Sequence, residues 1–260
     1  MPRLAANLSM MFTEADFLDR FAAAASAGFA GVEYLFPYAQ PAEVIADCLA
    51  SNNLVQVLFN IPAGDWDAGE RGIACLPDRV GEFRDGVGQA LDYAKATGCR
   101  LLHAMSGVAP DGSHPDRLTA TFVDNIRFAA EAAAGQGIDI MLEPINSKVD
   151  VPGYFLDATA QALAVIEAVD RPNVRLQYDI YHMQIMEGDV ARTIDTLLPK
   201  IGHMQLADNP GRNEPGTGEI NFPWLLGRID ALGYAGWIGC EYKPAAGTQA
   251  GLDWARPYLN

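Results

Sequence analysis

Strand-like and helix-like segments alternate along the whole of this chain, and the alternation limits the folds that it can adopt. Short runs rich in branched and aromatic residues predict strands at 3–9, 31–36, 54–60, 99–105, 138–144, 174–180, 201–207 and 237–243. Helical periodicity predicts helices at 13–27, 41–51, 80–97, 115–135, 158–169, 189–198, 222–232 and 248–258. Eight strand–helix units in 260 residues predict an α/β fold, a closed (β/α)8 barrel that spans residues 1–260 as one domain.

An open, doubly wound sheet is the rival arrangement, but it usually has fewer strands. No glycine-rich fingerprint, of the GxGxxG type or of the GxxxxGK type, follows a predicted strand, which disfavours a nucleotide-binding sheet. Helix boundaries carry the usual signals. Thr13 begins one predicted helix, with Asp16 three residues on, and Asn221 precedes another. Gly28, Gly98 and Gly233 follow predicted helices. These features favour the single TIM barrel.

The charge of the chain limits the classes of molecule that it can bind. The formal net charge is −15 with only 18 basic residues, and no basic run is present, so we expect no nucleic-acid binding. The four cysteines show no CxxC spacing and indicate reduced thiols. The first residues do not have the pattern of a secretory signal, and no stretch approaches the ~20 apolar residues of a membrane span. We therefore expect a cytoplasmic protein without membrane contact.

One loop is longer than its position requires. The segment 60–79, NIPAGDWDAGERGIACLPDR, follows the third predicted strand and is rich in Gly, Pro and charged residues. Loops of this length inside compact domains are usually functional or disordered. Trp66 and Arg71 within it favour a lid over a site, and an unstructured insertion is the alternative.

Polar residues stand at the ends of the last four predicted strands. They are Glu143, Asp179, Gln205 and Glu241. In a (β/α)8 barrel the carboxyl ends of the strands meet at one mouth, where three carboxylates would repel each other without a cation among them. Carboxylate and amide oxygens suit Mg²⁺ or Mn²⁺ better than Zn²⁺. The alternative is that these residues pair with Arg or Lys, or cap neighbouring helices.

Further polar residues lie close to these strand ends. Strand alternation puts His203 on the face of Gln205, and Lys243 on the face of Glu241. His182 follows Asp179 by three residues and could hydrogen-bond a developing oxyanion. We interpret His103 as structural, and the sequence does not decide the role of Glu33.

Several motifs together resemble one family. These are ANLSMMF, GVEYLFPY, NIPAGDW, GERGIACLP, EPIN, QYDIYHMQ, ADNPGRNEPGTGEIN and GCEYKP, and the last four carry the polar strand ends in order. The chain resembles the xylose-isomerase-like barrel superfamily nearly end to end, and within it the hydroxypyruvate isomerase branch. Related ketose epimerases usually have His where Gln205 stands, so Gln205 points toward the hydroxypyruvate isomerase branch. Gln205, rather than His203, is the expected ligand.

The resemblance implies a metal-dependent isomerase that interconverts hydroxypyruvate and tartronate semialdehyde through a cis-enediolate. The implied metal ligands are Glu143, Asp179, Gln205 and Glu241, binding Mg²⁺ or Mn²⁺. Glu143 and Glu241 would also act as the acid/base pair. The substrate, a small 2-oxo or hydroxy acid, would contact His182, Arg212, Lys243, Arg71 and Trp66. Lys243 is the favoured partner of its carboxylate, and Asp208 is expected to orient Arg212. Enzymes of this group commonly associate, so a homo-oligomer is compatible with the sequence.

Other functions stay open at this stage. A 2-oxo-tetronate isomerase or a ketose 3-epimerase of the same superfamily would use the same chemistry. An abasic-site endonuclease shares the barrel type, but it uses several metals and many His ligands, whereas this chain has four His and a charge of −15. A non-catalytic barrel that binds a sugar acid is the third class.

Overall fold

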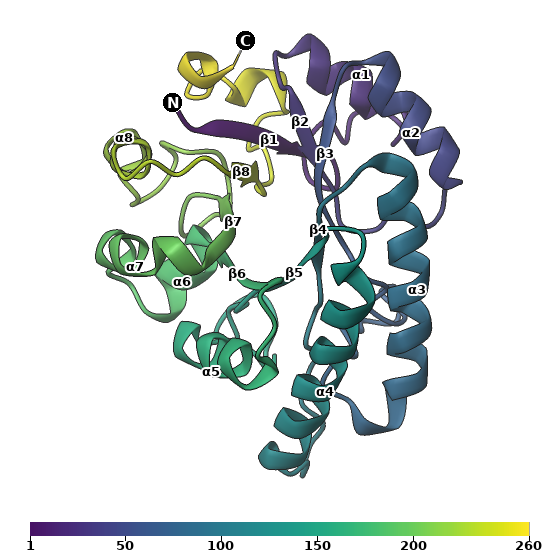
Figure 1. Ribbon diagram of the computed structural model, residues 1–260. Helices are drawn as coiled ribbons and strands as arrows, with labels where there is room; N and C mark the ends of the chain where they lie inside the picture. Colours follow the sequence, from purple (N-terminus) through teal and green to yellow (C-terminus); the bar gives the residue numbers. More distant parts are fainter. Residues whose placement is uncertain (260) are drawn as a thin grey trace.

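The predicted barrel is confirmed in the computed structural model, which describes residues 1–259 (Figure 1). The strands close in chain order, from β1 to β8 and back to β1, and each pairs in parallel with its neighbours. They are β1 (Arg3–Asn7), β2 (Gly31–Glu33), β3 (Val55–Asn60), β4 (Leu101–His103), β5 (Asp139–Leu142), β6 (Val174–Asp179), β7 (Ile201–Leu206) and β8 (Trp237–Cys240). This closure brings the carboxyl ends of distant strands to one mouth.

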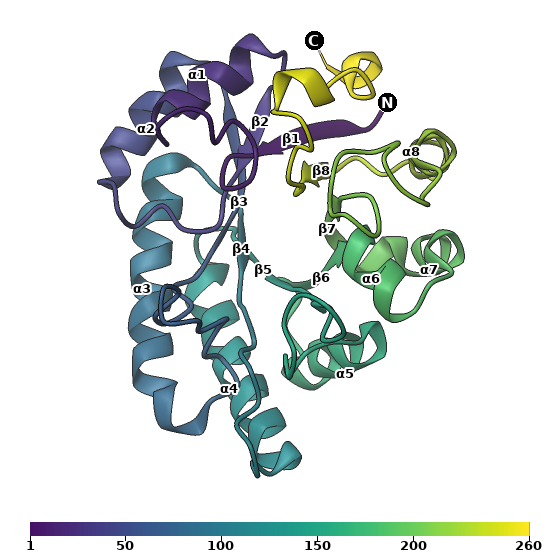
Figure 2. The ribbon, with the colours of Figure 1, turned by 180° about the vertical axis from the view of Figure 1, so that it is seen from behind.

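Helices form an outer ring around the strands, as both views show (Figures 1 and 2). They are α1 (Asp19–Ser26), α2 (Ala42–Ser51), α3 (Val80–Thr97), α4 (Pro115–Ala134), α5 (Thr159–Val169), α6 (Ile180–Met186), α7 (Val190–Leu197) and α8 (Phe222–Ala231). Each of the longer helices buries one apolar face, such as Phe122, Ile126 and Ala129 on α4. The main core lies between these faces and the outward side chains of the strands. No helix within residues 1–259 is long and apolar enough to cross a membrane.

Two helix predictions need correction. The segment 248–258 does not form an α-helix: it contains two short 3-10 turns, at Gln249–Gly251 and Arg256–Tyr258. Gly247 precedes the first turn and Pro257 lies within the second, and both oppose a continuous helix. The helix expected from residue 13 begins only at Asp19, because Phe12 adopts a left-handed φ of 57° and donates its N–H to Thr248. The short α6, directly after β6, was not predicted.

The inside of the barrel changes character along its axis. Its floor is apolar, built around Ala5, Val57 and Met141, with Trp237 packed against them. Nearer the mouth the inward side chains are polar and fully buried, as at Glu33, Gln177 and His203. Because buried polar groups must be hydrogen-bonded, this layer forms a network that supports the side chains above it.

Candidate metal centre and active-site cavity

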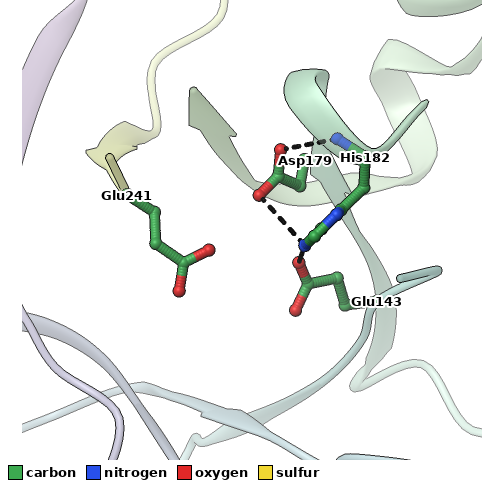
Figure 3. A group of neighbouring side chains, drawn as sticks. All are labelled: Glu143, Asp179, His182 and Glu241. Atoms are coloured by element: carbon green, nitrogen blue, oxygen red, sulfur yellow. Dashed lines mark hydrogen bonds and ion pairs between the residues drawn. The ribbon is translucent and has the colours of Figure 1, made fainter. Parts of the chain in front are cut away.

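Four buried side chains converge at the mouth of the barrel. One ligand atom from each of Glu143, Asp179, His182 and Glu241 lies within 4.8 Å of the others (Figure 3). Glu143 follows β5, Asp179 ends β6, His182 lies in the first turn of α6, and Glu241 follows β8. Figure 3 shows Glu241 approaching from the side of β8, opposite the other three. The donor set could hold a divalent metal ion.

Asp179 caps a helix with one oxygen and faces the site with the other. Its Oδ1 accepts hydrogen bonds from the backbone N–H of Tyr181 at 2.7 Å and of His182 at 3.2 Å. Its Oδ2 is buried and has no hydrogen-bond partner among residues 1–259, although it lies 3.8 Å from His182 Nε2. Capping therefore accounts for Oδ1 of this carboxylate but not for Oδ2.

The electrostatics of the cluster favour a cation. Burial, together with Glu241 and Asp179, raises the pKa of Glu143 well above its ordinary value. Burial raises the pKa of Glu241 to about 8, and the Arg212 guanidinium opposes this rise. Burial also raises the pKa of Asp179. Glu143 Oε1 is a second buried oxygen without a hydrogen-bond partner in the described part of the chain. Uncompensated carboxylates and orphaned oxygens are what a divalent ion would satisfy.

Hydrogen bonds determine which end of the Gln205 amide faces the cluster. Its Nε2 donates to Glu33 Oε1 at 2.9 Å, and its oxygen accepts from Gln177 Nε2 at 2.6 Å. The same Gln177 nitrogen donates to Glu143 Oε2 at 3.1 Å. The Gln205 oxygen is thus turned toward the side of Glu143. His203 instead pairs with Glu33, with Nε2 2.7 Å from Oε2. Of the two candidates, it is Gln205 that lines the cavity.

The cavity has a volume of about 310 Å³, at the lower end of the range of about 300–1,000 Å³ for small-molecule sites. Trp66 and Arg71, from the loop 60–79, reach its wall, as does Lys243 after β8. The Arg71 guanidinium stacks at 4.0 Å over the Trp66 ring, which packs edge-on against Phe36 at 5.0 Å. These contacts place the predicted lid residues at the cavity.

Arg212 reaches directly into the cluster. Its guanidinium donates to Glu241 Oε2 at 3.0 Å and to Asp150 Oδ2 at 3.1 Å. Within residues 1–259, Asp208 forms no hydrogen bond or ion pair with Arg212, but it anchors the loop that carries Arg212. The Asp208 carboxylate accepts from the backbone N–H groups of residues 209, 216, 218 and 220, at 2.9 to 3.1 Å. The orienting role expected of Asp208 is therefore indirect.

Some cavity residues were not identified from the sequence. Asn7, Asp150 and His103 line the cavity. Asn7 ends β1, so the strand-end rule could have found it, whereas Asp150 lies deep in a loop that carries no periodic signal. His103 was interpreted as structural, but its Nδ1 lies 3.4 Å from Glu143. Burial and His203 lower the pKa of His103 to about 3, so its ring is neutral.

A closed parallel barrel with a buried carboxylate cluster at its mouth places this chain among the TIM barrels that have a polar site at the carboxyl ends of their strands. The sequence profile described as xylose isomerase-like TIM barrel matches residues 21–258. The chain belongs to this family.

Individual relatives extend over its full length. The chain is 51% identical to the 2-oxo-tetronate isomerase of Cupriavidus necator over 259 residues, covering 100% of this chain and 99% of the relative. It is 51% identical to the hydroxypyruvate isomerase of Escherichia coli K12, covering 99% and 100%. A crystal structure from Brucella melitensis, described as an AP endonuclease of family 2, matches with a TM-score of 0.98 and 50% identity, covering 100% of both chains. The expectation of an isomerase is confirmed by the first two relatives.

Proposed function

We propose that this chain is a metal-dependent isomerase that interconverts hydroxypyruvate and tartronate semialdehyde, 2-hydroxy-3-oxopropanoate, in one barrel domain. The observation that carries the proposal is the meeting of Glu143 and Glu241 in one buried cluster at a small cavity, where burial raises the pKa of both. A carboxyl group whose pKa is raised above its ordinary value can both accept a proton and return it.

The reaction needs one carbon-bound proton to move between neighbouring carbons. One glutamate removes it from C3 of hydroxypyruvate, giving a cis-enediolate, and a carboxylic acid returns it to C2. The proton of the C3 hydroxyl passes to the C2 oxygen in the same conversion, which leaves an aldehyde at C3 and a hydroxyl at C2. Because Glu143 and Glu241 lie in one coupled cluster, base and acid are assigned to the pair and not to either residue. His182 hydrogen-bonds the oxygen on which negative charge develops.

The residues proposed to hold a Mg²⁺ or Mn²⁺ ion are Glu143, Asp179, Gln205 and Glu241. Such an ion supplies Lewis acidity, which stabilises negative charge on the substrate oxygens. Two orphaned oxygens and the inward amide oxygen of Gln205 support this ligand set.

A cation at the cavity wall would bind the substrate carboxylate. Arg212 is already paired with Glu241 and Asp150, whereas Lys243 Nζ makes no ion pair with any residue in 1–259. Lys243 is therefore the proposed partner. Arg71, stacked on Trp66 in the loop 60–79, is the second candidate.

The second candidate function is a 2-oxo-tetronate isomerase, since a relative with this name is equally similar, at 51%. It would apply the same proton transfer to a longer acid. A ketose 3-epimerase has weaker support, because epimerase structures such as L-ribulose 3-epimerase are 23% identical and show the fold alone. A cytoplasmic location and a homo-oligomeric state stay predictions.

The test is a substrate panel of hydroxypyruvate, 2-oxo-tetronates and ketoses, with abasic DNA as the nuclease control. We expect turnover of hydroxypyruvate that is lost with chelator and restored by Mg²⁺ or Mn²⁺. Glu143→Gln and Glu241→Gln should each lose activity, while the surface variant Glu131→Gln keeps it. Full activity in both site variants would overturn the proposed chemistry, and turnover confined to tetronates would overturn the substrate.

A further inference from the structure

The Asn146 side chain has only one orientation that its surroundings permit. Its Oδ1 lies 3.0 Å from the backbone N of Val149 and 2.8 Å from that of Asp150. Backbone N–H groups are donors only, so this end of the amide is the oxygen. The Nδ2 end therefore points the other way, toward His182 and the Asp150 carboxylate.

This orientation determines which nitrogen of His182 carries hydrogen. Asn146 Nδ2 lies 2.7 Å from His182 Nδ1 and 3.0 Å from Asp150 Oδ2, so it donates to both. A ring nitrogen that accepts a hydrogen bond bears no proton, and a neutral imidazole has one N–H. The hydrogen of a neutral His182 must then lie on Nε2.

His182 is held neutral by its position. The ring is buried, and a doubly protonated imidazolium would have no lone pair on Nδ1 to accept from Asn146. Its Nε2 faces the cluster, 3.7 Å from Glu143 Oε1 and 3.8 Å from Asp179 Oδ2. An N–H there points at these two carboxylates. Arg212 Nη2, which can only donate, lies 3.5 Å from the same nitrogen, beyond the usual hydrogen-bond range of about 2.7–3.2 Å, whereas the Asn146 contact with Nδ1 is 2.7 Å, so the shorter contact decides the tautomer.

We propose that Asn146 is a positioning residue that fixes His182 as the Nε2–H tautomer, so that His182 serves the site as a neutral hydrogen-bond donor and not as a metal ligand. A metal-binding His usually donates its other ring N–H to an acceptor, and here that nitrogen accepts instead. The fourth ligand position then falls to the Gln205 oxygen, although His182 lies within the cluster. The tautomer is a property of the resting protein and does not depend on the substrate.

The proposal is tested by ¹⁵N NMR of histidine-labelled, metal-free protein at pH 7, with the His182 signals identified by their loss in His182→Gln. We expect Nδ1 in the unprotonated range and Nε2 in the protonated range, unchanged when Mg²⁺ is added. Protonated Nδ1 in the wild type, or loss of the Nε2 proton with Mg²⁺, would overturn the assignment whichever substrate the enzyme turns over.

A near-isosteric variant tests the role of Asn146 itself. Asn146→Asp keeps an acceptor for the two backbone N–H groups but places a second acceptor opposite Nδ1, which should then shift into the protonated range. Asn213→Asp is the matched control, because Asn213 donates to the Lys243 carbonyl and does not contact His182, so the His182 signals should stay in place. An unshifted Nδ1 in Asn146→Asp would refute the positioning role. If that variant does not fold, the wild-type spectrum decides the tautomer alone.

Discussion

His203 and Glu33 form a fully buried pair beneath the active-site cavity, with Nε2 2.7 Å from Oε2. The pair joins β7 to β2 across the barrel. The same Glu33 carboxylate accepts from Gln205 and from Asn7 Nδ2 at 3.0 Å. A Cβ on Gly239 would overlap this carboxylate, so the glycine of β8 makes room for it. His203, two positions before the proposed ligand Gln205, therefore supports the site from below through Glu33.

Removal of Glu33 should destabilise the fold strongly. Glu33→Ala leaves His203 and the Gln205 amide without their buried acceptor, and breaking a buried pair costs roughly 3–5 kcal/mol. Urea unfolding would measure this loss. The control is Glu131→Ala, which breaks the exposed pair with Arg171 and should cost less than about 1 kcal/mol. Equal losses in the two variants would contradict the buried role of Glu33.

Glu33 should also influence cation binding through Gln205. In Glu33→Gln the new amide can donate as well as accept, so the Gln205 amide is free to rotate and present N–H to the site. Loss of such a supporting partner typically weakens metal binding about 10–100-fold. Isothermal titration calorimetry of metal-free protein with Mn²⁺ would measure the affinity. Glu131→Gln, the same change on the surface, is the control. Unchanged affinity in Glu33→Gln would show that Gln205 needs no orienting.

The raised pKa of Glu241 predicts a pH effect with a defined sign. A carboxyl group with a raised folded-state pKa holds a proton that the unfolded chain has lost, so its stabilising contribution falls as the pH rises toward about 8. The pKa of His103 is lowered, so the contribution of this residue to stability rises with pH, but only up to pH 6.5, the ordinary pKa of histidine. Metal-free protein should therefore lose stability between pH 6.5 and about 8, and Mg²⁺ should flatten the decline. Urea unfolding across this range, with and without Mg²⁺, checks both, and a rising curve without the ion would contradict the assignment.

The meeting of the polar residues at the strand ends could be predicted from the sequence, because it follows from the barrel topology. Glu143, Asp179, Gln205 and Glu241 meet since the carboxyl ends of parallel strands converge, and this needs only the strand pattern. The role of Glu33 could not be predicted, because its partner His203 is 170 residues away and the contact crosses the barrel.

The contacts of loop residues could not be predicted from the sequence pattern. Asn146 lies in the EPIN motif, but its effect on His182 depends on which backbone N–H groups the loop turns toward it. The absent C-terminal helix shows the same limit, since periodicity over 248–258 was overridden by Gly and Pro at its edges. Local pattern thus determined the scaffold, and tertiary contacts determined how its side chains are oriented.

The two candidate partners of the substrate carboxylate can be separated kinetically. Lys243→Ala should raise KM for hydroxypyruvate by roughly 10–100-fold, since a hydrogen bond to a charged group contributes about 1.5–3 kcal/mol. Its kcat should change less, because binding is lost in ground and transition states alike. Arg71→Ala is the matched variant in the loop 60–79. A larger KM effect for Arg71→Ala than for Lys243→Ala would reverse the assignment.

Asp208 should matter for both stability and activity, because it accepts the N–H groups that hold the Arg212 loop in place. Arg212 itself has a left-handed φ of 52°, a conformation that a bulky residue keeps only when its surroundings enforce it. Asp208→Ala leaves several backbone donors unpaired and should lower the free energy of unfolding by about 2–4 kcal/mol. Hydrogen exchange should rise in residues 209–220, and kcat should fall as the Arg212 guanidinium leaves Glu241. Asp195→Ala, which breaks the exposed pair with Arg228, is the control and should leave kcat unchanged. Wild-type exchange in the loop of Asp208→Ala would show that the loop is held by other contacts.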